Sequence, residues 1–319
     1  DDSFSGPWSG IISQMLPLLL FALLCLSSAA QAGGTVARVS PLPFDRSVDV
    51  PSGRFGSAAA LSGDGTTLVV SAPRANRFGR ENTGGVFVYI RDGETWTEQA
   101  DLSPSDRLPS EGEFGARLTI SDDGNTIVAV NGGFYQSNYA YLFTRNQGVW
   151  STPVEFDDEE VFAQAVSVLN GNGMVALIGK HMYVRNDENE WFQSTEFSED
   201  YYDATMDTAG YTVVLATETS YNIYERNGAG WVLAQSLNTT EPSIAKSGSI
   251  GEDYTIMVGE PYHGEFGAVY VFGAHGGAWP GTRYWRLEST IFPPEGDSTN
   301  QFGYDVTYKS DTGTAYVGA

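Results

Sequence analysis

The stretch FGSAAAL at residues 55–61, followed by TLVVSAP at 67–73, GVFVYI at 85–90 and WTEQADL at 96–102, decides the fold of this chain. The third segment alternates in the way of a half-buried strand. The second is a nearly continuous apolar run, which is typical of a more buried strand. Glycine-bearing turns between such segments supply the positive φ that tight hairpins need. The stretch therefore predicts four consecutive strands joined by short turns.

The same pattern returns along the chain at intervals of about 40–59 residues. Each return brings a Phe-Gly pair or a degraded form of it, an apolar strand and a strand that begins near a tryptophan. A fixed period of four short strands predicts one blade of an all-β propeller per repeat. We expect five full four-stranded blades and part of a sixth, about five and a half blades in all. The repeats open at Phe55-Gly56, Phe114-Gly115, Phe162-Ala163, Tyr202-Asp203, Ile244-Ala245 and Phe302-Gly303.

A tryptophan stands near the start of each fourth strand. Since a large aromatic side chain anchors stacked sheets well, we interpret these residues as packing residues of the core or of the junctions between blades. The residues are Trp96, Trp150, Trp191, Trp231 and either Trp279 or Trp285.

The composition supports a sizeable core and excludes one class of partner. The chain has 319 residues, of which 41% are hydrophobic and 37 are glycine. It contains 40 acidic residues and 17 basic ones, which gives a formal charge of -23. Because binding to phosphates needs clustered lysine and arginine, we expect no nucleic-acid partner.

The N-terminal residues predict a secretory signal. The apolar run that begins at Met15 is about a dozen residues long and ends in the small-x-small sequence AQA at 30–32. We expect residues 1–32 to comprise upstream residues and a signal peptide, and residues 33–319 to form the propeller of a secreted or cell-surface protein. An uncleaved membrane anchor is the alternative, but a span needs about 20 apolar residues, so no stable membrane span is expected. Cys25, the single cysteine, lies within the run, so the mature protein would contain no disulfide.

The last residues of the chain, 314–319, fall inside the second strand of the sixth repeat. We interpret the propeller as C-terminally truncated, with an exposed edge on its final strand. Blade faces would then be uncovered, so we expect marginal stability or aggregation of this chain by itself. In an alternative interpretation, the repeats are a structural region of a larger surface protein.

The repeats resemble FG-GAP repeats, the units of integrin-alpha-like β-propellers, and in particular a secreted variant of that family. The resemblance is carried by FG at 55–56, LSGDG at 61–65, VSAP at 70–73, GVFVY at 85–89 and MVGEP at 257–261. It covers about the whole stretch from residue 36 to residue 319. It implies seven blades in a complete ring, an extracellular or surface location, and a role in adhesion, ligand binding or scaffolding.

Calcium binding is also implied by the resemblance, because integrin-type repeats often carry an Asp-x-Asp-x-Asp-Gly pattern in the turn between the first and second strands. Here the pattern fails, since one such turn offers Asp64 alone and the next offers the adjacent pair Asp122 and Asp123. Calcium takes about 6–8 converging oxygen ligands, which adjacent carboxylates do not supply. We interpret these turns as plain hairpin turns and expect no cofactor. Ca²⁺ at Asp64, Asp122 and Asp123 is the alternative.

Common catalytic motifs are missing from the sequence. The three histidines, His181, His263 and His275, have no metal-binding spacing, and no Gly-x-Ser-x-Gly elbow occurs. We therefore expect a protein that is not an enzyme. Paired carboxylates are plentiful, so a secreted polysaccharide hydrolase or lyase on a propeller scaffold is the alternative.

The loops after each second strand and each fourth strand are expected to emerge on one common face, here called the loop face. Loops on a rigid scaffold are where binding residues collect, and these loops carry aromatic, acidic and basic residues. We predict that the loop face binds an extracellular glycan or protein ligand. The alternative for each residue is an acidic, solvated rim with aromatic side chains folded inward. The candidate ligand-binding residues are Arg74, Arg77, Phe134, Tyr135, Asp158, Asp200, Tyr262 and His263.

One modification site is also predicted. Asn238-Thr239-Thr240 is an N-glycosylation sequence on an expected loop, usable in a glycosylating secretory route. The sequence as a whole predicts a secreted or cell-surface, non-catalytic adhesion or binding module.

Overall fold

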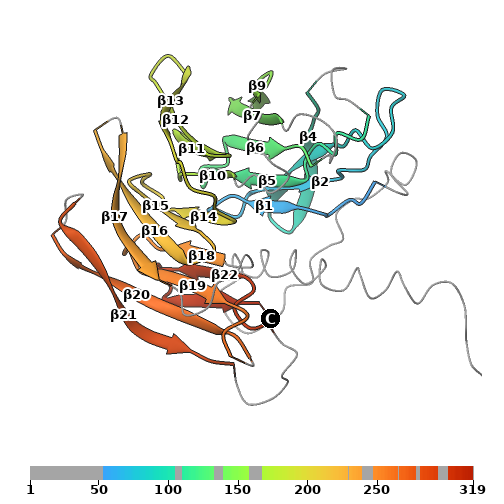
Figure 1. Ribbon diagram of the computed structural model, residues 1–319. Helices are drawn as coiled ribbons and strands as arrows, with labels where there is room; N and C mark the ends of the chain where they lie inside the picture. The colour runs from blue at the N-terminus through green and yellow to red at the C-terminus, as the bar shows by residue number, and fades with distance from the viewer. Residues whose placement is uncertain are drawn as a thin grey trace, which may run out of the picture. The chain divides into compact units, whose positions relative to one another are not determined.

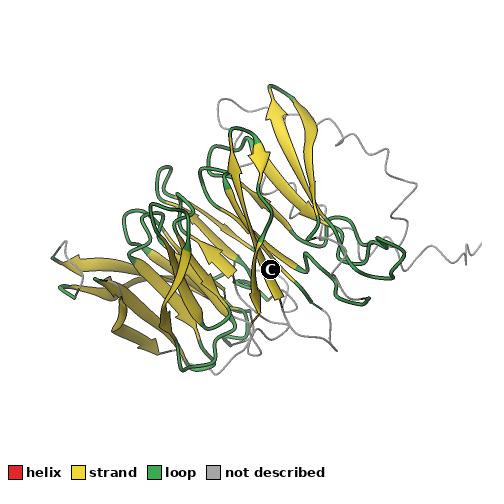
Figure 2. Ribbon diagram, turned by 90° about the horizontal axis from the view of Figure 1, so that it is seen from above, coloured by secondary structure: helices red, strands yellow, loops and turns green. Residues whose placement is uncertain are grey.

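The structure is a computed structural model that describes residues 53–104, 110–132, 139–157, 167–228, 230–238, 247–264, 266–277, 281–293 and 301–318. Within these ranges every regular element is a β-strand (Figure 2). None of the described residues belongs to a helix that is long and apolar enough to cross a membrane. The expected signal peptide at 1–32 lies outside the described residues.

The chain divides into two compact units, Asp1–Asp157 and Asp158–Ala319, with the boundary between two repeats. Unit 1 contains two antiparallel sheets in its described part (Figure 1). The first has the order β1 (Ala59–Leu61), β2 (Thr67–Ser71), β3 (Val86–Asp92) and β4 (Thr95–Leu102). The second has the order β5 (Arg117–Ile120), β6 (Thr126–Val130), β7 (Tyr139–Asn146) and β8 (Val149–Trp150), and β9 (Val154–Asp157) also pairs with β7.

Unit 2 repeats this architecture in its described part, with three four-stranded sheets and one of two strands. The first sheet consists of β10 (Ser167–Leu169), β11 (Val175–Ile178), β12 (His181–Arg185) and β13 (Trp191–Glu196). The second consists of β14 (Asp203–Met206), β15 (Thr212–Ala216), β16 (Ser220–Asn227) and β17 (Gly230–Asn238). The third consists of β18 (Ser247–Ile250), β19 (Ile256–Glu260), β20 (Ala268–Gly276) and β21 (Arg283–Ile291). The last consists of β22 (Val306–Lys309) and β23 (Thr314–Val317).

The predicted order of strands is confirmed. Each of the five full repeats forms one antiparallel sheet with four strand positions, and in the second sheet β8 and β9 together occupy the fourth position. The partial sixth repeat forms the two-stranded sheet. The second strands β2, β6, β11, β15 and β19 are buried along their whole length, as their apolar runs predict. Of the two tryptophans considered for the fifth repeat, Trp285 lies in the fourth strand, and Trp279 lies outside the described residues.

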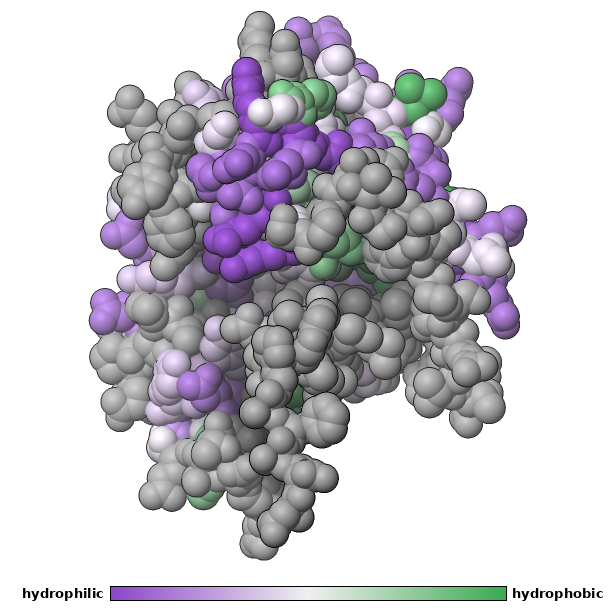
Figure 3. Space-filling model, turned by 90° about the vertical axis from the view of Figure 1, so that its right-hand side faces the viewer, coloured by the Kyte–Doolittle hydropathy of each residue, from purple (hydrophilic) through white to green (hydrophobic). Residues whose placement is uncertain are grey.

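The two sheets of unit 1 share one hydrophobic core. Val69 and Val88 of the first sheet pack in the same cluster as Phe114, Ile127 and Tyr141 of the second. Phe114 is fully buried, and its ring meets that of Tyr141 edge-on, with 5.4 Å between centroids. Figure 3 shows hydrophilic side chains, in purple, gathered on part of the face that it presents. Phe114 is thus a core residue, and Phe55 and Phe302 of the same motif are half-buried and pack against other hydrophobic cores.

The Phe-Gly pair forms the junction between one sheet and the next. The Phe114 amide donates a hydrogen bond to the carbonyl oxygen of Thr83, in the loop between β2 and β3, at 2.9 Å. Gly84 pairs with Phe114 in an isolated parallel bridge, and a Cβ on Gly84 would lie 2.2 Å from the Phe114 carbonyl oxygen. Gly267 and Phe302 form the same bridge in unit 2. Glycine is required at both positions because the two backbones touch.

The fourth strands share an irregularity three residues after the tryptophan. The pairing of β3 with β4 skips Gln99, and the pairings that involve β13, β17 and β21 shift at the corresponding residue. The second sheet has Pro153 at this position. Because proline has no N–H to donate to the neighbouring strand, the fourth strand is divided there into β8 and β9. A bulge bends and twists an edge strand, which makes it a poor template for pairing with another chain.

Candidate functional site

The acidic turns between first and second strands satisfy their own carboxylates. Asp64 accepts hydrogen bonds from Ser62 Oγ at 2.6 Å and from the Thr66 amide at 2.9 Å. Partial burial would raise the pKa of Asp64, but these hydrogen bonds outweigh it, and the pKa lies below its ordinary value. Asp123 accepts in the same way from Ser121 Oγ at 2.5 Å. The carboxylates therefore close their own hairpin turns.

The third acidic residue of these turns, Asp122, takes part in the contact between the two sheets of unit 1. Its carbonyl oxygen accepts a hydrogen bond from the Gly63 amide of the preceding turn at 3.0 Å. In the described part of the chain, no group of three or more His, Cys, Asp or Glu side chains could hold a metal ion. Hydrogen bonds within the hairpins thus account for the carboxylates of Asp64 and Asp123.

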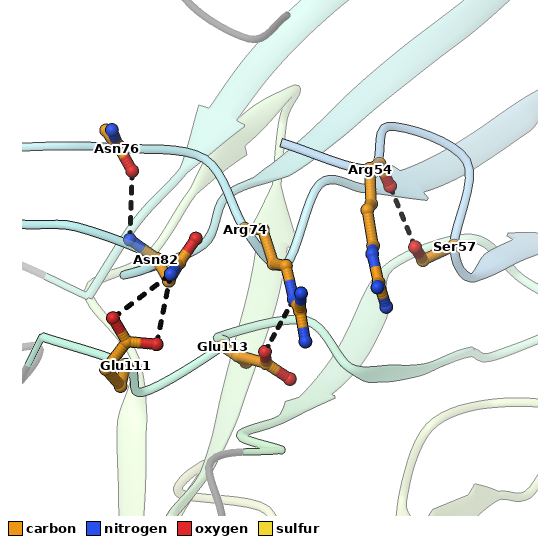
Figure 4. Close-up of polar contacts among 7 residues, drawn as sticks. All are labelled: Arg54, Ser57, Arg74, Asn76, Asn82, Glu111 and Glu113. Atoms are coloured by element: carbon orange, nitrogen blue, oxygen red, sulfur yellow. Dashed lines mark hydrogen bonds and ion pairs between the residues drawn. The ribbon is translucent and has the colours of Figure 1, made fainter. Parts of the chain in front are cut away.

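On the loop face of unit 1, Arg74 forms an ion pair with Glu113. The distance from Arg74 Nε to Glu113 Oε1 is 2.8 Å, and the two side chains are 39% and 20% exposed. The Arg74 amide donates to the carbonyl oxygen of Gly53, so the exposed Arg54 stands next to this pair along the backbone. Figure 4 shows the Arg54 and Arg74 side chains extending in the same direction, with Glu113 beside Arg74. Two guanidinium groups and one carboxylate are therefore gathered at this place.

Arg77 has a different role in the same loop. Its Nη1 lies 2.8 Å from both carboxylate oxygens of Asp101, and its guanidinium lies over the Phe87 ring, 5.0 Å from the centroid. Its side chain is only 18% exposed. These contacts give Arg77 the task of fixing the loop between β2 and β3 to the sheet below.

Of the two acidic candidates, the structure describes Asp200. Asp158 lies outside the described residues, as do Phe134 and Tyr135. Asp200 follows β13 and pairs with Lys180 Nζ at 2.8 Å, while its side chain is 84% exposed. An exposed carboxylate that is already ion-paired lacks the shelter from water that a general acid has in an active site. Asp200 is better suited to hydrogen bonding than to catalysis.

The loop face of unit 2 carries a group of side chains that we call the aromatic loop cluster. It lies where the loop between β19 and β20 meets the end of β21 and the segment before β22. Four of its members are aromatic and between 40% and 59% exposed. The cluster comprises Tyr262, His263, Phe266, Phe292, Gln301 and Tyr304.

Several contacts connect the members of the cluster. Gln301 Nε2 donates to the Tyr262 hydroxyl at 3.2 Å. The His263 ring lies 6.3 Å from the Phe292 ring, measured between centroids. The backbone carbonyl of Phe266 accepts from the amide of the next sheet's Phe302 at 3.2 Å, one residue beyond Gln301. The structure therefore brings together the predicted Tyr262 and His263 and adds four neighbours that were not predicted.

Buried polar groups support the cluster from below. His263 Nδ1 lies 3.1 Å from the Tyr270 hydroxyl and 3.9 Å from Glu260 Oε2. Glu260 is itself buried, with 3% of its surface exposed. The Tyr221 hydroxyl donates to the Gly259 carbonyl at 2.7 Å, and burial raises the pKa of Tyr221 well above its ordinary value. This network fixes the histidine ring beneath the exposed aromatic side chains.

The predicted glycosylation site is at the surface. Asn238 is the last residue of β17, pairs with Ser220 across the sheet, and is exposed. The two threonines that complete the sequence, at 239–240, lie outside the described residues. An acceptor at an exposed strand end is open to modification.

Comparisons with known proteins support the fold class. No family model and no curated protein sequence matches the chain. The structure of a proposed 6-phosphogluconolactonase from Bacteroides uniformis aligns with a TM-score of 0.53 and 14% identity, over 82% of this chain and 83% of that one. A functionally unknown protein from Desulfotomaculum acetoxidans aligns with a TM-score of 0.50 and 13% identity, over 74% of this chain and 69% of that one.

At such low identity the likeness shows the fold alone, an all-β propeller class built of four-stranded sheets. The finer resemblance to FG-GAP repeats gains no support from these comparisons. The function must therefore be argued from the side chains of the loop face.

Proposed function

We propose that the protein is a secreted or cell-surface, non-catalytic binding module that holds a glycan at the aromatic loop cluster. One observation carries the proposal. Four aromatic side chains, Tyr262, Phe266, Phe292 and Tyr304, are 51%, 40%, 59% and 56% exposed around a single junction of loops.

The chemistry of the cluster suits a sugar ring. Exposed apolar groups that gather in one patch mark a binding surface more often than chance exposure, and single scattered ones do not. Aromatic side chains with a polar handle combine an apolar face with a hydrogen-bonding edge, as a pyranose ring also does. Gln301, His263 and Tyr262 add amide, imidazole and hydroxyl groups at the rim of the patch. In a typical ligand site the surface is mostly apolar, and a few polar groups fix the orientation of the ligand.

Two features of the sequence support the extracellular part of the proposal. The apolar run from Met15 to Ala32 has the form of a secretory signal. The Phe-Gly openings resemble FG-GAP repeats, a family with roles in adhesion and ligand binding. A secreted adhesion protein meets glycans on cell surfaces and in the extracellular matrix, and the aromatic loop cluster has the chemistry to bind a glycan.

A glycan array probed with the full chain, followed by calorimetric titration of the best glycan, tests the proposal. Tyr262→Ala and Phe292→Ala should each weaken binding about tenfold, since each removes an exposed aromatic surface. Tyr211→Ala is the matched control, because Tyr211 is 50% exposed but lies in the turn between β14 and β15, at the opposite end of its strands. The Tyr211→Ala variant should bind the glycan with the same affinity as the unaltered protein. Binding to no glycan, or equal losses in all three variants, would overturn the proposal.

A further inference from the structure

The pair Arg74–Glu113 in unit 1 and the pair Tyr262–Gln301 in unit 2 occupy equivalent positions. In each pair the first residue follows the proline at the end of a second strand, and the second residue directly precedes a Phe-Gly pair. The partners are 39 residues apart in both cases. The neighbouring backbone contact is also the same, a parallel bridge between a loop glycine and the phenylalanine. One architectural position, which we call the junction slot, is thus filled by an ion pair in unit 1 and by a neutral pair in unit 2.

We propose that the junction slot of unit 1 is a second ligand subsite, and that Arg54 and Arg74 there bind the carboxylate of an acidic sugar. In the junction slot of unit 2 the side chains are one aromatic ring and one amide, both uncharged, which suits a neutral sugar ring. In unit 1 the equivalent position presents guanidinium groups. The same backbone framework therefore supports recognition of a charged group.

The charges at this slot leave a place for an anion. Arg74 uses Nε to bind Glu113, and its side chain is 39% exposed. Arg54 is exposed, and its side chain has no ion pair among the described residues. Glu113 balances the charge of Arg74, and Glu111 of the same loop is bound by the neutral Asn82, so the guanidinium of Arg54 is the group left to meet an anion. A planar guanidinium binds a carboxylate through two parallel hydrogen bonds, which gives specificity as well as affinity.

The backbone around the slot is held in an unusual conformation. Eight non-glycine residues of the described chain have positive φ, and Arg54, Phe78, Asn82, Glu111 and Glu113 are five of them. Such conformations cost about 1–3 kcal/mol each and gather at binding and active sites, where the surrounding structure enforces them. Here the enforcement is visible in Figure 4. The side chain of Asn82 donates to both carboxylate oxygens of Glu111, and the Ser57 hydroxyl donates to the Arg54 carbonyl at 2.8 Å.

Arg54 and Glu113, the residues directly before two successive Phe-Gly pairs, are brought near one another through Arg74, whose amide bonds to Gly53 and whose side chain bonds to Glu113. A preorganised loop loses less entropy when a ligand binds. The inference rests on the proposed function only for the class of ligand, a sugar, and its site lies in a different unit from the aromatic loop cluster.

Calorimetric titration of the full chain with an oligoglucuronate tests the inference. A carboxyl-reduced oligomer of the same length is the neutral comparison, and free glucuronate shows whether a single residue or a polymer is recognised. The acidic oligomer should bind at least about tenfold more tightly than the reduced one, and this preference should shrink as salt is added. Arg54→Gln should abolish the preference without lowering the melting temperature, since Arg54 has no ion pair to lose.

Arg91→Gln is the matched control. It removes the same charge from unit 1, but Arg91 lies in β3 and its Nε bonds to the carbonyl of Gly93 in the turn to β4. The Arg91→Gln variant should prefer the acidic oligomer to the same degree as the unaltered protein. Equal binding of acidic and reduced oligomers, or equal losses in Arg54→Gln and Arg91→Gln, would overturn the inference. Loss of neutral-glycan binding in Tyr262→Ala tests the aromatic loop cluster separately, so failure of one site is distinguishable from failure of the other.

Discussion

Replacing Gly84 with alanine should loosen the junction between the two sheets of unit 1. Gly84 has a φ of 92°, and an added Cβ would lie 2.2 Å from the carbonyl oxygen and 2.5 Å from the amide nitrogen of Phe114. Both contacts are with backbone, so no side-chain rotation relieves them. The first sheet must move away from the second, or Phe114 must leave its place in the core.

The expected loss is the sum of three contributions. A positive φ costs an L-residue about 1–2 kcal/mol. Breaking the hydrogen bond from the Phe114 amide to Thr83 removes about 1 kcal/mol. Partial exposure of Phe114, whose full burial contributes about 1.5–3 kcal/mol, removes part of that amount. Gly84→Ala should therefore destabilise unit 1 by about 3–5 kcal/mol, a large share of the stability of a typical domain.

Hydrogen–deuterium exchange with peptide resolution is the suitable assay, because it measures local opening in each unit separately. Gly93→Ala is the matched control, since Gly93 has a φ of 59° but nothing lies within 4 Å of its added Cβ. The Gly93→Ala variant should lose only about 1–2 kcal/mol of the free energy of unfolding, which is the cost of a positive φ for an L-residue. Peptides covering β2, β3 and β5 should exchange much faster in Gly84→Ala than in Gly93→Ala. Equal effects of the two substitutions would refute the steric account of the junction.

Three further outcomes are expected. Burial raises the pKa of Asp207, so the contribution of Asp207 to the stability of unit 2 should be greatest below about pH 4 and decline as the pH rises through the raised value. Asp207→Asn, which copies the hydrogen-bonding Asn170 of the preceding repeat, should remove this contribution to the pH dependence of urea unfolding at pH 4–7. Gln99→Ala should lower the free energy of unfolding by about 0.5–1.5 kcal/mol in the same assay, because Gln99 Oε1 accepts hydrogen bonds from Arg145 and Trp150 of the next sheet. An unchanged free energy of unfolding would show that water replaces these partly exposed hydrogen bonds. Adding Ca²⁺ or a chelator should leave the melting temperature unchanged, since the Asp64 and Asp123 carboxylates already accept hydrogen bonds within their turns. A marked rise of the melting temperature with Ca²⁺ would show that the ion binds the native state preferentially.

The strand order was predictable because its signals are local. Apolar alternation, turn glycines and tryptophan positions recur within each repeat, and each acts over a few residues. The bulge three residues after each tryptophan has a weaker local signal, which is visible only where Pro153 stands in place of a residue with an N–H. The bulge was therefore not predicted, although each fourth strand begins close to its tryptophan, as expected.

The candidate site was predicted only in part, for a physical reason. Arg74 and Tyr262 were found because they lie in loops rich in functional residue types. Their partners Glu113 and Gln301 were missed because each is 39 residues away and becomes a neighbour only when successive sheets pack together. A sequence signal for them does exist, namely the position directly before a Phe-Gly pair, but its meaning depends on the junction geometry.

That geometry separates the residues that hold the fold from those free to differ between repeats. Phe-Gly pairs and the glycines that face them fix the backbone on both sides of a junction slot, through bridges and buried rings. The side chains that enter the slot come from the residues just outside these landmarks, so they can change from Arg74 and Glu113 to Tyr262 and Gln301 while the backbone contact is kept. A repeat of this kind can exchange a charged pair for a neutral one by two substitutions while the backbone bridge beside the pair is kept. The recurrence of the motif therefore says little about the ligand, and the positions beside the motif say most.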